Sequence, residues 1–372
     1  MSQAKAIVSV INDLVTDQRV DRACHALLKS GYEVILVGRK LKNSLPLDEK
    51  PYRRHRMKLL FSKGPLFYLE YQIRLFFFLL FKKSDLLYSN DLDTLLPNYL
   101  MARMKSVKLI YDSHELFCEV PELLDNPKKR QLWKSLEQWI FPKLSSVITV
   151  NKSIASIYEE EYHQKLYVVR NIPLTRENIQ LKNRKELGIA EDKKLIILQG
   201  AGINIQRGAE EAVEAMQWVE NALLLIVGSG DVIDILKQMV VDLKLDDKVI
   251  ITGKVPYEQL TQYTHIADLG LSLDRDTNLN YRYSLPNKLF DYIHAQVPVM
   301  VSPLVEISRI VKDYQIGSII QKHDPKHIAE KINDAFKHPD TYQQWKKNLI
   351  TAKEDLSWEK EEQVLLECIH KA

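Results

Sequence analysis

Cysteine, long apolar runs and a secretion signal are scarce or missing in this sequence, and each absence excludes a class of protein. Cysteine occurs only at Cys24, Cys118 and Cys368, far apart and without Cys-x-x-Cys spacing, so neither a disulfide framework nor a structural zinc site is expected. No run of about 18 apolar residues is present that could span a bilayer. The amino end passes straight into a strand-like run without a separate apolar signal core, which predicts a cytoplasmic protein.

Two nucleotide-related motifs are also missing. The loop after the first expected strand, residues 12–18, lacks the Gly-x-Gly-x-x-Gly of a dinucleotide-binding turn, which disfavours a nicotinamide-dependent dehydrogenase. The sequence contains no recognised nucleic-acid-binding module, so nucleic acid is not expected as a partner.

What is present is an alternation of short apolar runs and helical stretches. The chain has 372 residues, 45% of them hydrophobic and 27% charged, which is an ordinary globular balance and longer than one hydrophobic core usually supports. The alternation is typical of an α/β protein whose parallel sheets are covered on both faces. Expected strands in the first half are residues 6–11, 33–37, 85–89, 107–111, 147–150 and 167–169.

A second series of strands and helices follows a polar stretch at residues 175–192, which we expect to be the hinge. Two such series predict two similar domains, with residues 1–172 forming the first domain and residues 173–356 the second. A last helical segment begins at residue 357. Expected strands in the second half are residues 195–198, 223–227, 249–251, 269–273, 297–301 and 318–320.

Residues 284–303 have the pattern of a loop, a helix and a strand. Pro286 is compatible with a first helical turn, where the free amides of Asn287 and Lys288 point out of the helix end and suit an anion. Lys288 adds a full positive charge, and Asp291, one turn later, offers a carboxylate that suits a ribose diol. The alternative is an ordinary amphipathic helix packed between two strands.

This segment resembles the donor-binding signature of retaining glycosyltransferases of the GT-B fold, of the family 4 type, in the variant that reads Ser-x-Pro-x-Lys-x-x-Glu-Tyr. Ser284, Leu285 and Pro286 then contribute to donor binding, and Asp291 stands where the family has the second Glu of a paired motif. Tyr283 stands in place of the first Glu, a departure that concerns recognition of the donor sugar more than of the nucleotide. The resemblance implies two Rossmann-like domains facing a cleft, with the terminal helix, residues 357–372, crossing back to the first domain.

Glycine-containing turns after strands predict further donor contacts. Gly200 and Gly202 precede Arg207, whose planar guanidinium can hold two phosphate oxygens; the alternative is a glycine turn with a surface arginine. Gly228 and Gly230 resemble the Gly-x-Gly that closes the next strand in the family. One strand later, Lys254 and Val255 correspond to residues whose backbone groups read the base edge in the family.

The first domain carries one polar cluster, Tyr-Asp-Ser-His-Glu at residues 111–115. A lone histidine after a strand is more often structural, and Ser113 could cap a helix. The family reads Tyr-Asp-x-His-Glu here, which implies that His114 hydrogen-bonds near the anomeric bond of the donor sugar. Residues 17–20 resemble an Asp-x-Arg-Val start found in bacterial relatives; alternatively, Asp17 caps a helix and Arg19 is a solvated residue of its first turn.

Two Asp-x-Asp triplets could suggest a metal site. Asp91 and Asp93 begin a helix after a strand, where acidic residues cap the helix and complement its dipole, and Asp274 and Asp276 belong to a polar loop. We favour a structural role for both triplets, so no metal and no other cofactor is expected.

Positive charge is concentrated between residues 51 and 83. This window contains eight Lys and Arg residues and one Glu, a charge of +7, and since the whole chain carries +3 the remainder carries −4. Residues 75–81 are apolar and largely aromatic, and cations flank them at Arg74, Lys82 and Lys83. Two interpretations are open: an interfacial element attracted to an anionic membrane surface, or a core helix with basic ends.

The sequence therefore predicts a retaining glycosyltransferase that uses a nucleotide-diphosphate sugar and a glycan or lipid-linked acceptor. Retention is implied by the resemblance. The alternatives are a GT-B-fold sugar-nucleotide epimerase and a degenerate relative that only binds a glycan or nucleotide sugar.

Overall fold

The computed structural model describes residues 3–15, 17–42, 44–174 and 180–372. The chain divides into two compact units, Met1–Asn171 with Glu359–Ala372, and Ile172–Trp358. These are called the N-terminal and the C-terminal unit below. Part of the expected hinge, residues 175–179, lies outside the described residues.

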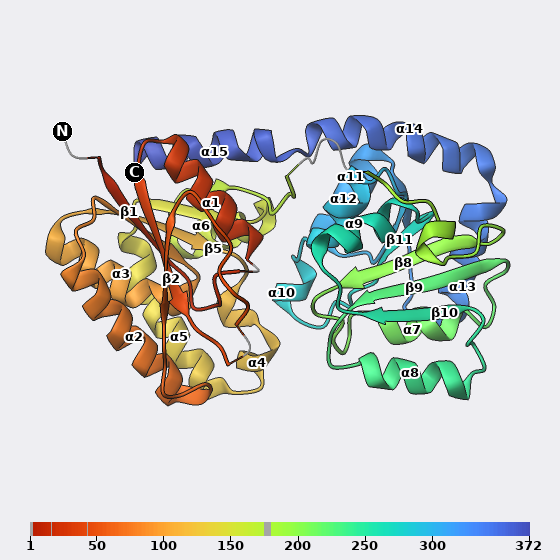
Figure 1. Cartoon of the computed structure of the whole chain (residues 1–372), viewed down its shortest axis with the longest axis horizontal. Coiled ribbons are helices and arrows are strands. Elements are labelled where there is room, and N and C mark those ends of the chain that lie inside the picture. The colour runs from red at the N-terminus through yellow and green to blue at the C-terminus, as the bar shows by residue number, and fades with distance from the viewer. Residues whose placement is uncertain (1–2, 16, 43, 175–179) are drawn as a thin grey trace. The chain divides into compact units, whose positions relative to one another are not determined.

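The N-terminal unit contains a seven-stranded parallel sheet in the order β3-β2-β1-β4-β5-β6-β7 (Figure 1). The sequence did not predict β3, because its Arg-Arg-His-Arg-Met run lacks an apolar pattern; as an edge strand it needs none. The strands are β1 (Lys5–Ser9), β2 (Glu33–Arg39), β3 (Arg53–Met57), β4 (Leu86–Asn90), β5 (Lys108–Ser113), β6 (Ser146–Thr149) and β7 (Tyr167–Val168).

Helices cover both faces of this sheet, with α1 and α15 on one face and α2, α3 and α5 on the other (Figure 1). Helix α1, for example, buries an apolar stripe that includes Val20, Ala23 and Leu27. The helices are α1 (Gln18–Lys29), α2 (Gly64–Phe81), α3 (Leu92–Lys105), α4 (Pro121–Leu124), α5 (Pro127–Ile140), α6 (Lys152–Tyr162) and α15 (Trp358–Lys371).

The terminal helix α15 belongs to the N-terminal unit, which confirms the predicted crossover. Glu361 of α15 is buried, and its carboxylate accepts hydrogen bonds from the backbone amide of Arg170 (2.6 Å) and from its guanidinium Nε (2.8 Å). Lys29 of α1 donates to Glu362 at 2.7 Å. The first pair of contacts holds α15 against the segment after β7, and the contact with Lys29 joins it to the end of α1.

The C-terminal unit contains a six-stranded parallel sheet in the order β10-β9-β8-β11-β12-β13. All six strands overlap runs predicted from the sequence, because each run is apolar; the four inner strands are largely buried, and the edge strands β10 and β13 are mostly half-buried. The strands are β8 (Lys194–Gly200), β9 (Ala222–Gly228), β10 (Val249–Gly253), β11 (Leu269–Ser272), β12 (Val299–Val301) and β13 (Gly317–Ile319).

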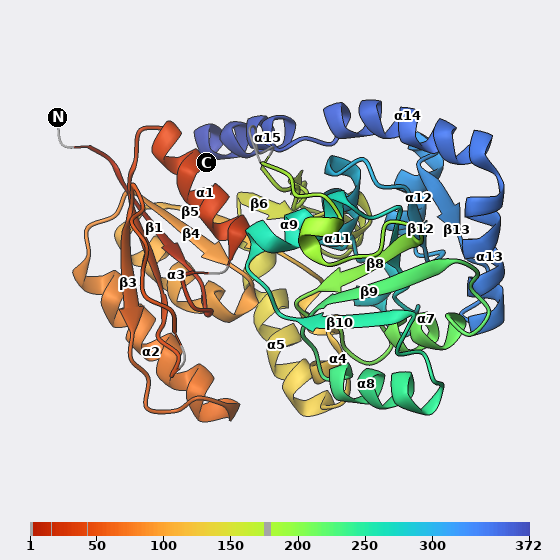
Figure 2. The ribbon, with the colours of Figure 1, turned by 45° about the vertical axis from the view of Figure 1, so that its right-hand side comes forward.

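Two apolar clusters form the core of this unit. One joins the sheet to α7, α8 and α13, and the other joins it to α11, α12 and α14; Figure 2 shows α7 and α8 on one side of the sheet and α9 and α11 on the other. The helices are α7 (Ala209–Ala215), α8 (Ile233–Asp242), α9 (Tyr257–His265), α10 (Leu279–Arg282), α11 (Asn287–His294), α12 (Val305–Tyr314), α13 (Pro325–Lys337) and α14 (Pro339–Asp355).

Within the described ranges, no helix combines the length and the apolar character that crossing a membrane requires.

Candidate active site

Both sheets reverse their strand order at one point. In the N-terminal unit the reversal lies between β1 and β4, and in the C-terminal unit it lies between β8 and β11. Open parallel sheets bind ligands outside the carboxyl ends of the strands at such a switch point. The residues that follow β1, β4 and β5, and those that follow β8 and β11, are therefore the first candidates for a site.

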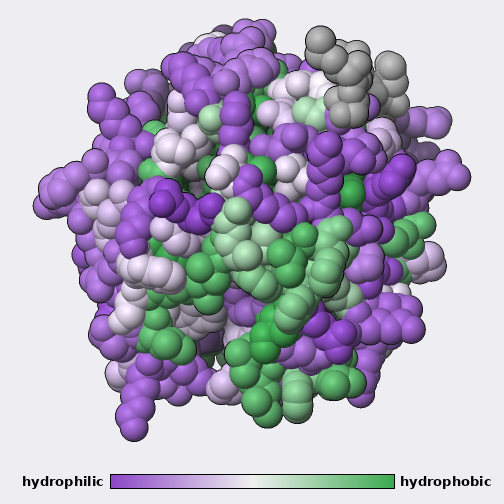
Figure 3. Space-filling view, turned by 90° about the vertical axis from the view of Figure 1, so that its left-hand side faces the viewer, coloured by the Kyte–Doolittle hydropathy of each residue, from purple (hydrophilic) through white to green (hydrophobic). Residues whose placement is uncertain are grey.

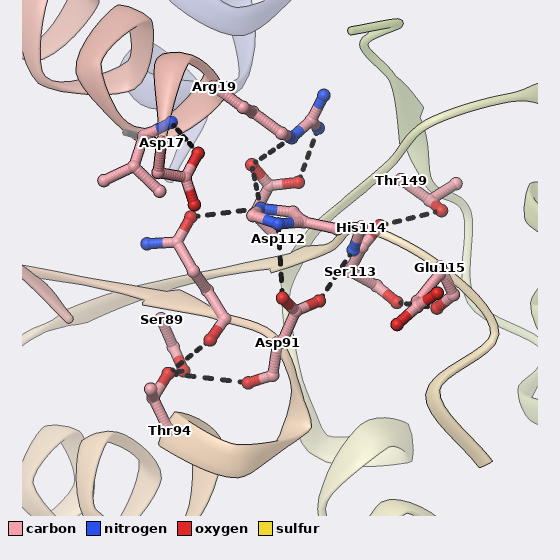
Figure 4. Close-up of polar contacts among 12 residues, drawn as sticks. Asp17, Arg19, Ser89, Asp91, Thr94, Asp112, Ser113, His114, Glu115 and Thr149 are labelled. Carbon is pink, nitrogen blue, oxygen red and sulfur yellow. Dashed lines mark hydrogen bonds and ion pairs between the residues drawn. The ribbon is translucent and has the colours of Figure 1, made fainter. Parts of the chain in front are cut away.

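At the switch point of the N-terminal unit, Arg19 of α1 forms a two-pronged ion pair with Asp112 at the end of β5 (Figure 4). The Nε–Oδ2 and Nη2–Oδ1 distances are 3.1 and 2.6 Å, and Nη1 donates to the carbonyl oxygen of Val169 at 2.7 Å. Tyr88 donates its hydroxyl proton to Asp112 Oδ2 at 2.8 Å. Arg19 is only 5% exposed, so the hypothesis of a solvated first-turn residue is wrong.

His114 lies against this ion pair, between two carboxylates (Figure 4). Its Nδ1 lies 3.2 Å from Asp91 Oδ2, and its Nε2 lies 3.5 Å from Asp112 Oδ2 and 3.2 Å from Asn90 Oδ1. Asn90 Nδ2 donates to the carbonyl oxygen of Ser9 at 2.9 Å, which leaves Oδ1 as the atom facing the ring. Both ring nitrogens thus face acceptors, an arrangement that suits the doubly protonated imidazolium.

The charges around His114 agree with this protonation state. Burial by itself lowers the pKa of His114, but the neighbouring carboxylates of Asp91 and Asp112 raise it well above its usual value. For Asp112 burial acts in the opposite direction and raises the pKa, but the positive charges of Arg19 and His114 together lower it below its usual range. His114 can therefore act as a charged hydrogen-bond donor.

Asp91 corrects one expectation from the sequence. It precedes α3, but within the described residues neither Asp91 nor Asp93 caps this helix with its side chain. Asp91 instead adopts φ of 57° and ψ of 167°, which is rare for a residue with a side chain, and accepts from the backbone amide of His114 at 2.9 Å. Its carboxylate therefore orients His114 and does not cap α3.

The sequence also suggested Asp17 and Ser113 as helix caps in this unit, and only one of them is a cap. Asp17 caps α1, because its carboxylate accepts from the amide of Val20 at 3.1 Å. Ser113 does not cap a helix; its hydroxyl donates to the carbonyl oxygen of Glu115 at 2.9 Å.

At the switch point of the C-terminal unit, a single buried carboxylate joins Arg207 and Lys288. Arg207 Nη1 lies 3.0 Å from Asp274 Oδ1, and Lys288 Nζ lies 3.5 Å from Asp274 Oδ2. The Arg207 guanidinium also lies over the ring of Tyr281, 4.5 Å from its centre. The two cations predicted to bind a diphosphate thus lie together, although they are far apart in the sequence.

Asp274 is the residue that the sequence reading missed. It lies in a loop after β11, as the sequence predicts, but it is 1% exposed, and its Oδ2 also accepts from Ser272 at 3.2 Å. Burial raises the pKa of Asp274, but the positive charges of Lys288 and Arg207 lower it by more than burial raises it. The pKa is therefore below its usual value, and the carboxyl group is ionised. Two cations and one anion leave this cluster with a net charge of +1, counted as 2 − 1.

The glycines of this unit differ in how much space surrounds the position that a Cβ would occupy. A Cβ on Gly228 would lie 1.8 Å from the carbonyl oxygen of Gly200, and a Cβ on Gly230 would lie 1.9 Å from that of Ile203, so close backbone packing explains both. Gly200 and Gly202 have no neighbour closer than 3.8 Å to such a Cβ. The fold does not require glycine at these two positions, which leaves close approach of a ligand as a reason.

The segment before α11 supplies unpartnered polar groups. Ser284 has a buried hydroxyl oxygen without a hydrogen-bond partner among the described residues. Pro286 is the residue before the helix rather than its first residue, and no described side chain caps this end. The first-turn amides at Asn287 and Lys288 therefore retain the donor capacity expected of a helix start.

Asp291 lies at a small pocket in the C-terminal unit. Its two carboxylate oxygens accept from Tyr257 Oη at 2.9 Å and Gln199 Nε2 at 3.0 Å. The pocket is also lined by Thr264, His294 and Lys353. These contacts hold the carboxylate in one orientation.

The other predicted donor residues lie in the same unit. Lys254 is exposed and Val255 is half-buried, directly after β10. Leu285 is half-buried and packs against the apolar cluster that includes α11. The structure thus places all the predicted donor residues in one unit, at or just after the ends of β8, β9 and β10, in the segment before α11, or within α11; their roles in binding stay predictions.

Two Rossmann-like units, each with a polar cluster at its switch point, define the GT-B class of glycosyltransferases. Solved GT-B structures share the fold over almost the whole chain. Sucrose-phosphate synthase from Thermosynechococcus elongatus superposes with a TM-score of 0.81 at 16% identity, covering 99% of both chains. HepE from Anabaena, solved in complex with UDP, has a TM-score of 0.73 at 13% identity, covering 99% of this chain and 100% of the other.

The sequence comparisons identify the family. Residues 17–172 match the model described as Glycosyltransferase Family 4, and residues 179–351 match the model described as Glycosyl transferases group 1. The chain belongs to glycosyltransferase family 4. A curated relative, an uncharacterised glycosyltransferase of Methanocaldococcus jannaschii, is 27% identical over 198 residues, which cover 49% of this chain and 48% of the relative. The match thus spans about half of that relative's length.

Proposed function

We propose that this protein is a retaining glycosyltransferase that moves a sugar from a nucleotide-diphosphate donor to an acceptor hydroxyl. The observation that carries the proposal is the convergence of Arg207 and Lys288 on Asp274 at the switch point of the C-terminal unit. HepE, a structural neighbour of this chain, was crystallised with UDP and with UDP-glucose, which makes uridine nucleotides the first donors to test.

The diphosphate of the donor binds Arg207 and Lys288. Arg207 presents a planar set of donors that matches phosphate oxygens, and Lys288 supplies a compact charge beside the uncapped start of α11. Hydrogen bonds to charged groups contribute about 1.5–3 kcal/mol each. As the anomeric bond breaks, negative charge grows on the leaving diphosphate, and the same groups stabilise it.

Asp274 holds the two cations in place before the donor arrives. Two cations without this carboxylate would repel each other in a partly buried site, whereas with it they keep a net charge of +1. The donor then meets a positive cluster whose geometry already exists, which reduces the entropic cost of binding.

In the N-terminal unit, His114 hydrogen-bonds to the donor sugar near the anomeric carbon when one of its two N–H groups turns to the sugar from the acceptors that hold it here, Asp91 on Nδ1 and Asn90 and Asp112 on Nε2. Asp91 and Asp112 keep the ring protonated and oriented, so the group donates and does not serve as a nucleophile. Retention follows from attack on the same face, in which the departing phosphate takes the proton of the acceptor hydroxyl. The reaction needs no metal, because Arg207, Lys288 and the amides of α11 balance the charge of the diphosphate.

The acceptor is a glycan or a lipid-linked sugar of a surface polysaccharide or glycolipid pathway. The enzyme works at the cytoplasmic face of the plasma membrane, attached peripherally. Support for this placement comes from the basic and apolar window of residues 51–83, part of which is exposed.

The first experiment is a thermal-shift panel of nucleoside diphosphates and their sugars, since a ligand that prefers the native state raises the melting temperature. We expect UDP or another nucleoside diphosphate to raise it, and Lys288→Ala to abolish most of the rise. The exposed lysine variant Lys312→Ala is the matched control. An equal rise in Lys288→Ala and the wild type would contradict the proposed clamp.

Product analysis separates the three candidate activities. A transferase releases nucleoside diphosphate with an acceptor-dependent glycoside, and an epimerase yields a second sugar nucleotide. A binding module yields neither product. Activity that persists in excess EDTA supports metal independence, and activity that EDTA abolishes contradicts it.

A further inference from the structure

Helix α2 is apolar on two opposite faces, and only one of them is buried. Phe67, Tyr71, Leu75 and Leu79 recur every four residues and pack into the core of the N-terminal unit. The opposite face exposes a second apolar stripe, in which Phe77 is 50% and Phe81 79% exposed. The exposed stripe consists of Leu66, Leu69, Ile73, Phe77 and Phe81.

This exposed stripe, together with the loop residues Leu60 and Phe61, forms what we call the α2 apolar face. A contiguous green band on this side of the N-terminal unit is visible in Figure 3. Monomeric proteins rarely expose large contiguous apolar patches without a binding role. The core-helix interpretation is thus correct for one side of α2 and leaves its other side unexplained.

Hydrogen bonds from charged side chains fix the position of the loop and of the helix end at the α2 apolar face. Glu70 accepts from the backbone amides of Leu60 and Phe61 at 2.9 and 3.0 Å, and from Arg74 Nε at 2.7 Å. These bonds tie the loop to the helix, so that Leu60 and Phe61 stay beside the stripe. At the other end, Lys105 Nζ donates to the carbonyl oxygens of Leu79 and Lys82 at 2.6 and 2.7 Å.

Positive charge surrounds the α2 apolar face. Between residues 58 and 83 there are five cations and one anion, a net charge of +4, counted as 5 − 1. The single anion, Glu70, is already paired with Arg74. The cations are Lys58, Lys63, Arg74, Lys82 and Lys83, all of them exposed.

Resting on the peripheral membrane attachment in the proposed function, we propose that the α2 apolar face is the surface that binds an anionic lipid bilayer. Aromatic and aliphatic side chains on one helix face, bordered by lysines, match an element that lies in the membrane interface with its apolar side towards the acyl chains. The lysines then meet the negative lipid phosphates. A second copy of the chain fits this surface poorly, because pairing two such faces brings two sets of like charges together.

Vesicle co-sedimentation tests the proposal without using activity or the donor site. The wild-type protein should sediment with vesicles of phosphatidylcholine and phosphatidylglycerol, and much less with phosphatidylcholine alone. Lys82→Glu/Lys83→Glu should lower the partition coefficient by about tenfold or more, since each cation near an anionic surface contributes about a fivefold change. Lys312→Glu/Lys347→Glu, at two exposed positions of the C-terminal unit, is the charge-matched control.

The apolar contribution is tested by Ile73→Asp/Phe77→Asp. Both side chains are about half exposed, so the double variant should fold and melt like the wild type while losing vesicle binding. Ile235→Asp/Val241→Asp, two exposed apolar positions on α8, is the matched control and should bind as the wild type does. Equal binding of all four variants would overturn the proposal.

Two further readouts distinguish other occupants. A polarity-sensitive fluorophore on Ile73→Cys should shift to the blue on addition of anionic vesicles; the three native cysteines are buried, which favours labelling at this position. An unshifted spectrum counts against insertion. Sedimentation velocity should give a monomer for the wild type without lipid, and a dimer that Ile73→Asp/Phe77→Asp dissociates would assign this face to a second copy instead.

Discussion

The switch points of the two units share a design and differ in charge. Each contains a buried aspartate, Asp112 or Asp274, that pairs with an arginine from the segment after the first strand, Arg19 or Arg207. In the N-terminal cluster Arg19 and His114 face Asp112 and Asp91, which gives a net charge of zero. The C-terminal cluster keeps a net charge of +1.

The arginine of the N-terminal cluster is more buried and forms more hydrogen bonds than the arginine of the C-terminal cluster. The Arg19 side chain is 5% exposed and uses three of its nitrogens in bonds to Asp112 and Val169, whereas the Arg207 side chain is 29% exposed and reaches Asp274 through Nη1. The first cluster is satisfied by its own groups. The second is arranged to accept an anion, which is why we assign the diphosphate to the C-terminal unit.

The largest expected effect is the loss of stability when a buried carboxylate is removed. Asp112→Asn leaves the buried Arg19 without its counter-charge and should lower the free energy of unfolding of the N-terminal unit by about 3–5 kcal/mol. Asp274→Asn should cost less, because its partners can reach water. Urea unfolding with hydrogen exchange resolved for each unit measures both values, and equal losses would break the comparison.

The next effect is on ligand affinity. Lys288→Ala should weaken binding of a nucleoside diphosphate by about 10- to 100-fold, the loss of one hydrogen bond to a charged group. His114→Gln, in the neutral cluster, should leave this affinity unchanged and lower turnover. Isothermal titration and initial rates give the two numbers. If His114→Gln weakens diphosphate binding as much as Lys288→Ala does, the assignment of roles to the two units is wrong.

A smaller effect is the pH dependence of stability. The pKa of His114 is raised in the folded protein, so its stabilising contribution is complete below the unfolded pKa of about 6.5. It is lost as pH rises towards the folded pKa, by at most about 1.4 kcal/mol per pH unit. The difference between the wild type and His114→Gln in urea unfolding at several pH values isolates this slope. A difference that does not change between pH 6 and pH 9 would show that His114 is not held as an imidazolium.

The smallest expected effect is on the fold at Gly200. Gly200→Ala has room for the added Cβ and should change the free energy of unfolding by less than about 0.5 kcal/mol. It should nevertheless weaken diphosphate binding, since the methyl group projects where the ligand approaches. Gly228→Ala, which clashes with the backbone of Gly200, is the contrasting control and should destabilise the C-terminal unit. A large stability loss in Gly200→Ala would mean that the glycine is structural.

Much of the fold could be predicted because local patterns determine it. The strands of the C-terminal unit are apolar runs, and α15 carries an apolar stripe. β3 and the two-sided character of α2 were not predictable, since an edge strand needs no apolar pattern and a helix that is apolar all round gives no sign of which face is covered.

The site was only half predictable for a related reason. Arg207, Lys288 and His114 follow recognisable local motifs. Asp112 and Asp274 also stand in local motifs, but their pairing with these cations is not local. Strand order decides which loops meet: Arg19 and Asp112 are 93 residues apart, and Arg207 and Asp274 are 67 apart. Asp112 lies near the end of β5 and Asp274 lies two residues after β11; aspartates are common at such positions, so neither one indicates its partner.

A crystal structure of the protein soaked with UDP tests the central claim most directly. The account predicts the diphosphate at the carboxyl ends of β8 and β11, with Arg207 and Lys288 both within hydrogen-bond distance of its oxygens and the start of α11 directed at it. A diphosphate bound elsewhere, with both cations still engaged only by Asp274, would contradict the account.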